Sequence, residues 1–300
     1  MKRRIKRGVA AAAAVMAAST AIFLGNTSGA SAAAPSLPAF GLINGTTMSS
    51  FLTNNPAKLD WVADIVGFVG CDTRLIGVDM RVQDGLLYGV GNCPSSAGFA
   101  NIYTIPFLPT SDFLMPITKV SQLTVGLDGT TFDIDFNPAA DRLRIISDNG
   151  QNLRHNLGNH TTIADMPLNL NGPLAKGVTA AAYTNNDLNG GSATTLFTID
   201  TLNDQVAIQA PPNNGILNPT GNLGVNTGLD AGADIFSDLP SPGSPSGKTI
   251  TNTAFAAFVP TGTTRASFYT FDVLTGTATK IGDFPSIAPV TDVAVDLDKS

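Results

Sequence analysis

The stretch that decides the fold is Thr131–Leu157, TFDIDFNPAADRLRIISDNGQNLRHNL. Its first part alternates apolar and polar side chains, the period-two pattern of a β-strand with two different faces; the apolar members are Phe132, Ile134 and Phe136. Asn137-Pro138 ends this strand because proline lacks the backbone N–H that a sheet needs. Asn149-Gly150 marks a second turn, since Asn-Gly pairs accept positive φ angles. The stretch therefore predicts a strand–turn–strand–turn–strand unit.

The first turn fixes the predicted register of the hairpin. A four-residue loop from Pro138 to Asp141 sets apolar residues opposite apolar ones, whereas a loop one residue longer would set Asp135 against Leu143. Face matching favours the shorter loop, and it gives three cross-strand pairs: Phe136 with Leu143, Ile134 with Ile145, and Asp135 with Arg144. From the last pair we expect a structural ion pair between Asp135 and Arg144.

Degraded copies of this unit recur along the chain. The segment LIGVDMRVQDGLLYGVG, which starts at Leu75, aligns with it without a gap and places Asp79 on Asp135. First strands are expected near residues 75, 131, 178, 233 and 290, a spacing of about fifty residues. Repeats of this length built from short strands are typical of β-propeller blades. We predict an all-β fold, a β-propeller of five blades; an irregular blade within residues 211–228 would make six.

The two ends of the chain complete the predicted ring. VTDVAVDL, from Val290, is a first strand with no return strand after it, whereas residues 40–69 contain strand-like pieces with no first strand before them. Pairing the N- and C-terminal strands completes one blade and removes exposed sheet edges. We therefore expect a single propeller domain over residues 40–300.

Residues 1–32 have the pattern of a signal peptide. A basic start precedes an apolar run from Val9 to Leu24, which is short for a membrane span, and Ala30-Ser31-Ala32 is a typical cleavage site. Arg3-Arg4 suggests the twin-arginine route, but its surroundings fit the general secretory route better. We expect a monomeric extracellular protein with no membrane anchor and a flexible mature N-terminus at residues 33–39.

The acidic composition limits the partners of the chain. Loss of the leader removes five of the 17 basic residues and none of the 23 acids, which leaves 12 against 23 and a net charge of −11. Such a surface repels nucleic acid and anionic lipid, so neither is expected as a partner. All of the acids are aspartate, which favours turns, and glutamate, which favours helix interiors, is absent. The composition agrees with an all-β chain.

The two cysteines predict a disulfide bond. Cys71 precedes the first strand of its blade and Cys93 follows the return strand, so an antiparallel hairpin brings them together. In an exported protein a disulfide is the expected state of such a pair. Closing a loop of this length stabilises the fold by about 3 kcal/mol in the chain-entropy model.

Several separated strings resemble one bacterial family. DFNPAADRLRIISDNGQNLRHN, AAAYTNN, LFTID, QAPPNNG and FYTFDVLTGTATKIG together resemble, in the family's order, the domain of unknown function catalogued as DUF4394. The resemblance implies a secreted β-propeller-like domain without an assigned activity. Ser237–Lys248 departs from the family pattern and resembles an inserted loop rich in proline, serine and glycine.

Carboxylates on the first strands are the candidates for a metal site. Aligning the copies gives Asp79, Asp135 and Asp296 equivalent places, and in a propeller these strands line the central channel. With Asp133 and Asn137 they offer the oxygen ligands that calcium prefers. The competing interpretation pairs each aspartate with an arginine or with backbone donors. No cofactor is required, and calcium is the cation this set would take.

The two histidines do not predict a site. His155 and His160 flank the Gly158-Asn159 turn. A zinc site normally has three or four protein ligands, so two histidines are too few. We expect both to be exposed turn residues.

Two functional classes remain from the sequence. The first is a binding or scaffold module that recognises an extracellular polymer, glycan or protein through its long polar loops, Asn186–Ala193 and Ser237–Lys248. The second is a calcium-dependent hydrolase or lactonase that acts at the central channel. The residues favour the first class, and they name neither a substrate nor a catalytic set.

Overall fold

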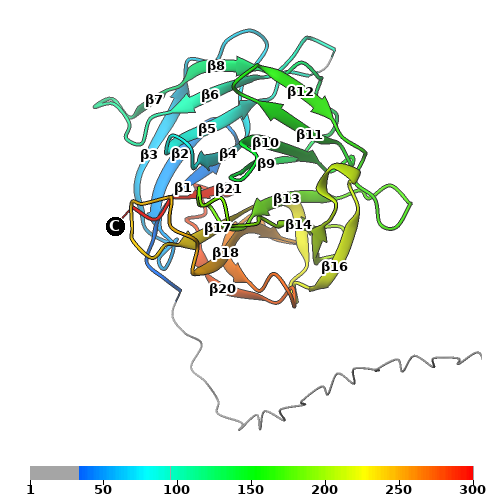
Figure 1. Cartoon of the computed structure of the whole chain (residues 1–300). Helices are drawn as coiled ribbons and strands as arrows, with labels where there is room; N and C mark the ends of the chain where they lie inside the picture. Colours follow the sequence, from blue (N-terminus) through cyan, green and yellow to red (C-terminus); the bar gives the residue numbers. More distant parts are fainter. Residues whose placement is uncertain (1–33, 95, 300) are drawn as a thin grey trace, which may run out of the picture. The chain divides into compact units, whose positions relative to one another are not determined.

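The computed structural model describes residues 34–94 and 96–299. Their strands form five separate sheets arranged in a ring, a five-bladed β-propeller (Figure 1). Within these residues the only helical element is a single 3₁₀ turn, η1 (Pro212–Asn214). No helix of the described chain is long and apolar enough to cross a membrane. The predicted signal peptide, residues 1–32, lies outside the described residues.

Four of the blades are four-stranded antiparallel sheets whose first strand lies innermost. The first contains β4 (Leu75–Arg81), β5 (Leu86–Gly91), β6 (Asn101–Ile105) and β8 (Thr118–Gln122). The second contains β9 (Phe132–Asn137), β10 (Arg142–Ser147), β11 (Asn152–Asn156) and β12 (Thr161–Ala164). The third contains β13 (Val178–Tyr183), β14 (Leu196–Asp200), β15 (Gln205–Gln209) and β16 (Leu217–Asn222). The fourth contains β17 (Thr227–Asp238), β18 (Thr251–Pro260), β19 (Ser267–Phe271) and β20 (Ala278–Asp283).

The fifth blade joins the two ends of the domain. Its inner strand is β21 (Val290–Val295), and its order continues through β1 (Pro38–Ile43), β2 (Thr47–Leu52), β3 (Leu59–Val66) and β7 (Leu114–Pro116). β21 pairs antiparallel with β1, which sets Phe40 opposite Ala294. Of the segment predicted to be flexible, residues 33–39, the last two residues, Pro38 and Ala39, belong to β1, and the Leu37 N–H donates to Thr53 Oγ1 at 2.9 Å. The predicted closure is confirmed.

The hairpin at the centre of the predicted unit has the expected register. Phe136 lies opposite Leu143, Ile134 opposite Ile145, and Asp135 opposite Arg144. Residues 211–228, where a sixth blade was the alternative, hold η1 and the outer strand β16 of the third blade. The ring therefore has five blades.

The apolar cores lie between neighbouring blades. One core joins Tyr88 and Val90 of the first blade to Ile134, Phe136 and Leu143 of the second. The ring of Tyr88 packs edge-on against that of Phe136, with centroids 5.2 Å apart. Beside this core the predicted Cys71–Cys93 disulfide is formed. These cores hold the blades side by side and leave the inner strands to line the channel.

Candidate functional site

The inner strands β4, β9, β13, β17 and β21 contact one another in a closed circle. Each pairs with a blade partner on one edge, and the other edge faces the next inner strand across the channel. The backbone N–H groups on that free edge are buried and need acceptors. Aspartate side chains supply them.

Five buried aspartates form two levels along the channel: Asp133 and Asp292 in one, and Asp79, Asp135 and Asp234 in the other. The levels follow from the strand period of two, because Asp133 and Asp135 accept N–H bonds from Ala181 and Tyr183, which are also two residues apart. Each level therefore draws one side chain from each of several blades.

The carboxylates tie each inner strand to the next one. Asp79 accepts from the N–H of Phe136 at 2.6 Å, and Asp292 accepts from the N–H of Val78 at 2.7 Å. Asp234 accepts from the N–H of Val295 at 2.6 Å, which ties the fourth blade to the closing blade. All except Asp135 also accept from the N–H of the residue that follows them. The aspartates thus replace the missing strand partners on the channel edge.

β13 is the exception because it carries alanine at both levels, Ala180 and Ala182. Asp133 compensates: its Oδ2 accepts from Ala181 on β13 at 2.8 Å and also from Ala233 on β17 at 3.4 Å. One carboxylate thus connects three inner strands.

Close approach in the channel requires glycine. A Cβ atom at position 232 would lie 2.2 Å from Oδ1 of Asp292, and one at position 77 would lie 3.3 Å from its Oδ2. Gly232 and Gly77 occupy the same level as Asp292, so the small residues of two blades make room for the carboxylate of a third. On this level the side chain of Asp292 therefore lies next to two glycines, Gly77 and Gly232.

The channel carboxylates have raised pKa values. Burial raises the pKa of Asp234 and of Asp292 to about 7. Burial, and then the nearby charge of Asp234, raises the pKa of Asp79 well above its usual value, and burial and then Asp79 do the same for Asp135. Among the ion pairs of the described residues, none includes these carboxylates. Protons or a bound cation must therefore offset their charge near neutral pH.

Three of these carboxylates have the spacing of a cation site. Asp79, Asp135 and Asp234 each offer one oxygen, and the three oxygens lie within 4.8 Å of one another. Oxygens about 2.4 Å from a shared calcium ion would fall within that distance of each other. Oδ1 of Asp135 also accepts from the N–H of Tyr183 at 3.0 Å. The group could therefore hold one hard cation.

The residues of the predicted metal set lie in two different places. Asp79, Asp133 and Asp135 do lie in the channel, but Asn137 and Asp296 do not belong with them. Asn137 Oδ1 instead accepts from the N–H of Ala140 in the β9–β10 turn. Asp296 follows the end of β21 and pairs with Lys299 at 2.7 Å. The members that the sequence comparison missed are Asp234 and Asp292.

The predicted ion pair between Asp135 and Arg144 is wrong. Although the two residues are cross-strand neighbours, Asp135 turns to the channel edge and Arg144 turns away from it. The buried guanidinium of Arg144 donates to Asp165 at 2.7 Å and to Asn152 at 2.7 Å. Asp165 also binds Arg154. Arg144 also donates to Tyr183 and Asn213 of the third blade, so it ties the second blade to the third rather than serving the channel.

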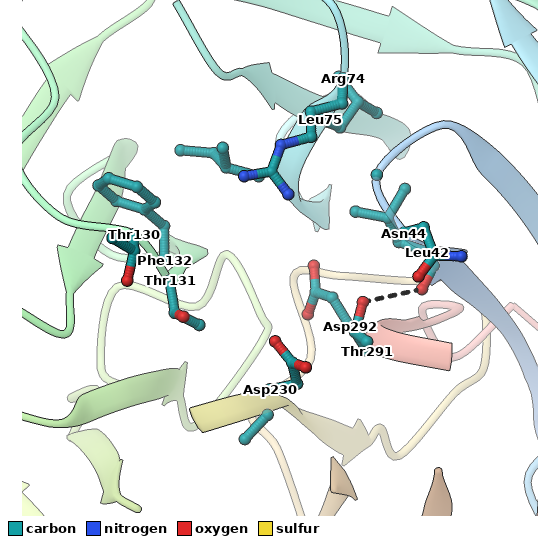
Figure 2. Close-up of a pocket in the computed structure, with 13 residues that line it drawn as sticks. Leu42, Asn44, Arg74, Leu75, Thr130, Thr131, Phe132, Asp230, Thr291 and Asp292 are labelled. Atoms are coloured by element: carbon teal, nitrogen blue, oxygen red, sulfur yellow. Dashed lines mark hydrogen bonds between the residues drawn. The ribbon is translucent and has the colours of Figure 1, made fainter. Parts of the chain in front are cut away.

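At the starting ends of the inner strands the channel opens into a polar cavity of about 280 Å³, here called the first mouth. Figure 2 shows the guanidinium of Arg74 and the carboxylates of Asp230 and Asp292 directed into this cavity. Threonine hydroxyls complete its wall, from Thr130, Thr131 and Thr291. Asp292 belongs both to this wall and to the channel, so the first mouth opens directly onto one of the channel carboxylates.

The opposite end, here called the second mouth, is built by two long loops, residues 184–195 between β13 and β14 and residues 239–250 between β17 and β18. The first contains the predicted loop Asn186–Ala193, and the second contains all but the first two residues of the predicted loop Ser237–Lys248. The loops bind each other: the Leu188 N–H donates to the Pro245 carbonyl at 2.6 Å, and Asn189 Nδ2 donates to the Ser246 carbonyl at 2.8 Å. Asp187 is the centre of the contact, since it accepts from the N–H and hydroxyl of Thr249. Burial alone would raise the pKa of Asp187, but these bonds outweigh it and lower that pKa.

The histidines differ from their predicted exposure. His160 is exposed, whereas His155 is fully buried, so the prediction is wrong for His155. Both contact Ser121 of the neighbouring blade: its Oγ lies 2.8 Å from His155 Nε2 and 2.9 Å from His160 Nδ1. Thr162 holds the other ring nitrogen of His155 at 3.0 Å. Burial, with a smaller contribution from His160, lowers the pKa of His155 to about 4, so it is neutral at physiological pH.

A family model described as "Domain of unknown function (DUF4394)" matches residues 47–294. The chain belongs to the DUF4394 family. No curated protein matches this DUF4394 chain. Among solved structures it is similar to a structural genomics protein of unknown function from Bacteroides thetaiotaomicron, at 13% identity and a TM-score of 0.42, covering 91% of this chain and 68% of that one. It is also similar to a protein from Lactobacillus plantarum, at 11% identity and a TM-score of 0.39, covering 87% of this chain and 99% of that one.

Proposed function

We propose that this DUF4394 protein is an extracellular binding module that recognises a polymer, glycan or protein at the second mouth. The observation that carries the proposal is the mutual bonding of the two long loops, which come from neighbouring blades and are locked together through Asp187. Loops that a rigid scaffold holds in one conformation lose little entropy on binding. The disulfide and the leader-like first residues support export by the general secretory route.

The proposal is tested by measuring binding of the purified protein to immobilised extracellular polysaccharides and proteins. Asp187→Ala removes the bonds that hold the loops together, so we expect its binding to fall at least about tenfold, or 1.4 kcal/mol. Arg74→Ala at the first mouth is the matched control and leaves binding unchanged. Binding that Arg74→Ala abolishes and Asp187→Ala preserves would place recognition at the first mouth and contradict the proposal.

A second candidate function is binding of a divalent cation in the channel. It is favoured by three carboxylate oxygens, one each from Asp79, Asp135 and Asp234, that lie within 4.8 Å of one another. Calcium would offset the buried charge and tie three blades together. The predicted hydrolase or lactonase would use such a cation to activate water; that activity remains a prediction from the sequence.

Calcium titration followed by thermal unfolding tests the second candidate. We expect calcium to raise the melting temperature by several degrees and Asp135→Asn to abolish the rise. Asp296→Asn, at a position outside the channel, is the control and keeps the rise. A melting temperature that does not respond to calcium would contradict cation binding and would leave protons as the groups that neutralise the channel.

A further inference from the structure

The second mouth contains a defined cavity of about 320 Å³. It lies between the loop of residues 184–195 and the β9–β10 turn, with Gln83 from the β4–β5 turn on one side. This volume is at the lower end of the range for small-molecule sites. The cavity is large enough for one ring of a ligand rather than for a whole macromolecule.

Two side-chain oxygens in the wall of this cavity have no internal partner. Among the described residues, buried side-chain atoms without a hydrogen bond occur in Gln83, Asn101, Thr194 and Gln209. Two of these residues, Gln83 and Thr194, line the cavity, and their free oxygens, Gln83 Oε1 and Thr194 Oγ1, are buried beside it. The Gln83 amide is fixed because its Nε2 donates to the Pro138 carbonyl at 2.7 Å, which leaves Oε1 as an acceptor. A buried polar atom without a partner costs about 1–3 kcal/mol. Two residues with such atoms line one cavity, so a small rotation of each side chain would let a ligand there supply the missing bonds.

The chemistry of the wall selects the class of ligand. Gln83 Oε1 accepts a hydrogen bond, and the Thr194 hydroxyl donates or accepts one; ligand hydroxyl groups can make both bonds. Pro138, Ala139 and the exposed side chain of Leu188 supply apolar surface beside these oxygens. No lysine or arginine lines the cavity, and its only acid is Asp187. An anion would meet Asp187 without a compensating cation, so the wall suits an uncharged ligand with both hydroxyls and C–H faces, as in a sugar ring.

A second cavity extends the site. It has a volume of about 280 Å³, lies along the loop of residues 239–250, and shares Gln83 with the first. Gln83 therefore lies between two adjoining hollows. A ligand of several linked rings can occupy both, whereas a single ring fills one.

We infer that the second mouth binds an uncharged oligosaccharide, with hydroxyl groups bonded to Gln83 Oε1 and Thr194 Oγ1. This inference rests on the proposed function and names its ligand class. It requires no change in the loops, since Asp187 already holds them in place.

Isothermal titration calorimetry of the purified protein with maltotriose, cellotriose, xylotriose and N-acetylchitotriose tests the inference. At least one of these uncharged trisaccharides binds, and Thr194→Val weakens that binding about tenfold because a bound hydroxyl loses its partner. Thr118→Val, on the exposed outer strand β8, is the matched control and leaves affinity unchanged. Gln83→Leu is expected to weaken trisaccharide binding by a similar factor, independently of Thr194→Val.

The two proposals fail in different ways. If no trisaccharide binds, or if Thr194→Val and Gln83→Leu bind as tightly as the wild type, the oligosaccharide inference is wrong. If an immobilised protein still binds and only Asp187→Ala abolishes that binding, the second mouth remains the recognition surface with a different ligand. If Asp187→Ala has no effect on any binding, the proposed function fails as well.

Discussion

The channel and the second mouth use buried polar groups in opposite ways. In the channel, the carboxylates of Asp79, Asp234 and Asp292 accept backbone N–H groups on both oxygens. At the second mouth, Gln83 Oε1 and Thr194 Oγ1 have no partner among the described residues. The saturated groups hold the ring together, whereas the two unsaturated groups belong to residues that line a cavity. The unpaired oxygens of Gln83 and Thr194 are therefore a better guide to a ligand-binding site than the more numerous carboxylates of the channel.

The largest expected effect comes from filling the channel. Gly232→Ala places a Cβ atom 2.2 Å from Asp292 Oδ1, so the carboxylate that ties β21 to β4 must move. Overpacking of this kind costs about 3 kcal/mol, and thermal or urea unfolding measures it. Gly190→Ala is the control because its Cβ meets no atom within 4 Å. Equal stability of the two variants would mean that Asp292 does not hold the ring.

A smaller effect is expected from pH. The folded pKa of Asp234 and of Asp292 is about 7, above an unfolded value of about 4. Protonation therefore favours the fold below about pH 4, and this contribution is lost as the pH rises through about 7. With a chelator present, we expect the melting temperature to fall between about pH 5 and 8.

Asp234→Asn tests the cause of that slope. The amide does not titrate, so the variant shows a shallower fall in melting temperature over the same pH range, whatever its absolute stability. Asp60→Asn, at an exposed site on β3, keeps the wild-type slope. A wild-type melting temperature independent of pH, or an unchanged slope in Asp234→Asn, would contradict the role of the channel carboxylates.

The smallest effect on stability is expected at the second mouth. Thr194→Val removes a hydroxyl without an internal partner, so the free protein keeps its melting temperature within about 1 kcal/mol of the wild type. Thr162→Val is the matched contrast, because its hydroxyl bonds to His155 Nδ1 and to the Thr124 N–H. We expect Thr162→Val to cost about 1–3 kcal/mol. Equal melting temperatures for Thr194→Val and Thr162→Val would contradict the claim that the Thr162 hydroxyl stabilises the fold and the Thr194 hydroxyl does not.

Much of the fold could be predicted because its signals are local. The alternation in β9 and the Asn137-Pro138 turn predicted the register with β10, and repetition of that unit predicted the inner strands. Pairing of Val290–Val295 with Pro38–Ile43 followed from the need to cover two unmatched edges. The strand register depends on residues that are close in the sequence, and the inner strands and the closure of the ring depend on the repeated unit.

The site was harder to predict because its geometry depends on contacts between blades. Asp292 and Asp296 lie on the same face of a period-two strand, so spacing alone does not separate them; β21 ends at Val295, which leaves Asp296 outside the channel. The room for Asp292 comes from Gly77 and Gly232 in other blades. The sequence does not indicate that Thr194 Oγ1 is unpaired, because the absence of a hydrogen-bond partner depends on the tertiary structure around it.

A crystal structure of the protein with the trisaccharide that binds it most tightly tests the central claim most directly. We expect sugar hydroxyls within about 3.2 Å of Gln83 Oε1 and Thr194 Oγ1, with the Asp187 contacts unchanged. Sugar density beside Arg74 at the first mouth, with both oxygens still unpaired, would contradict it.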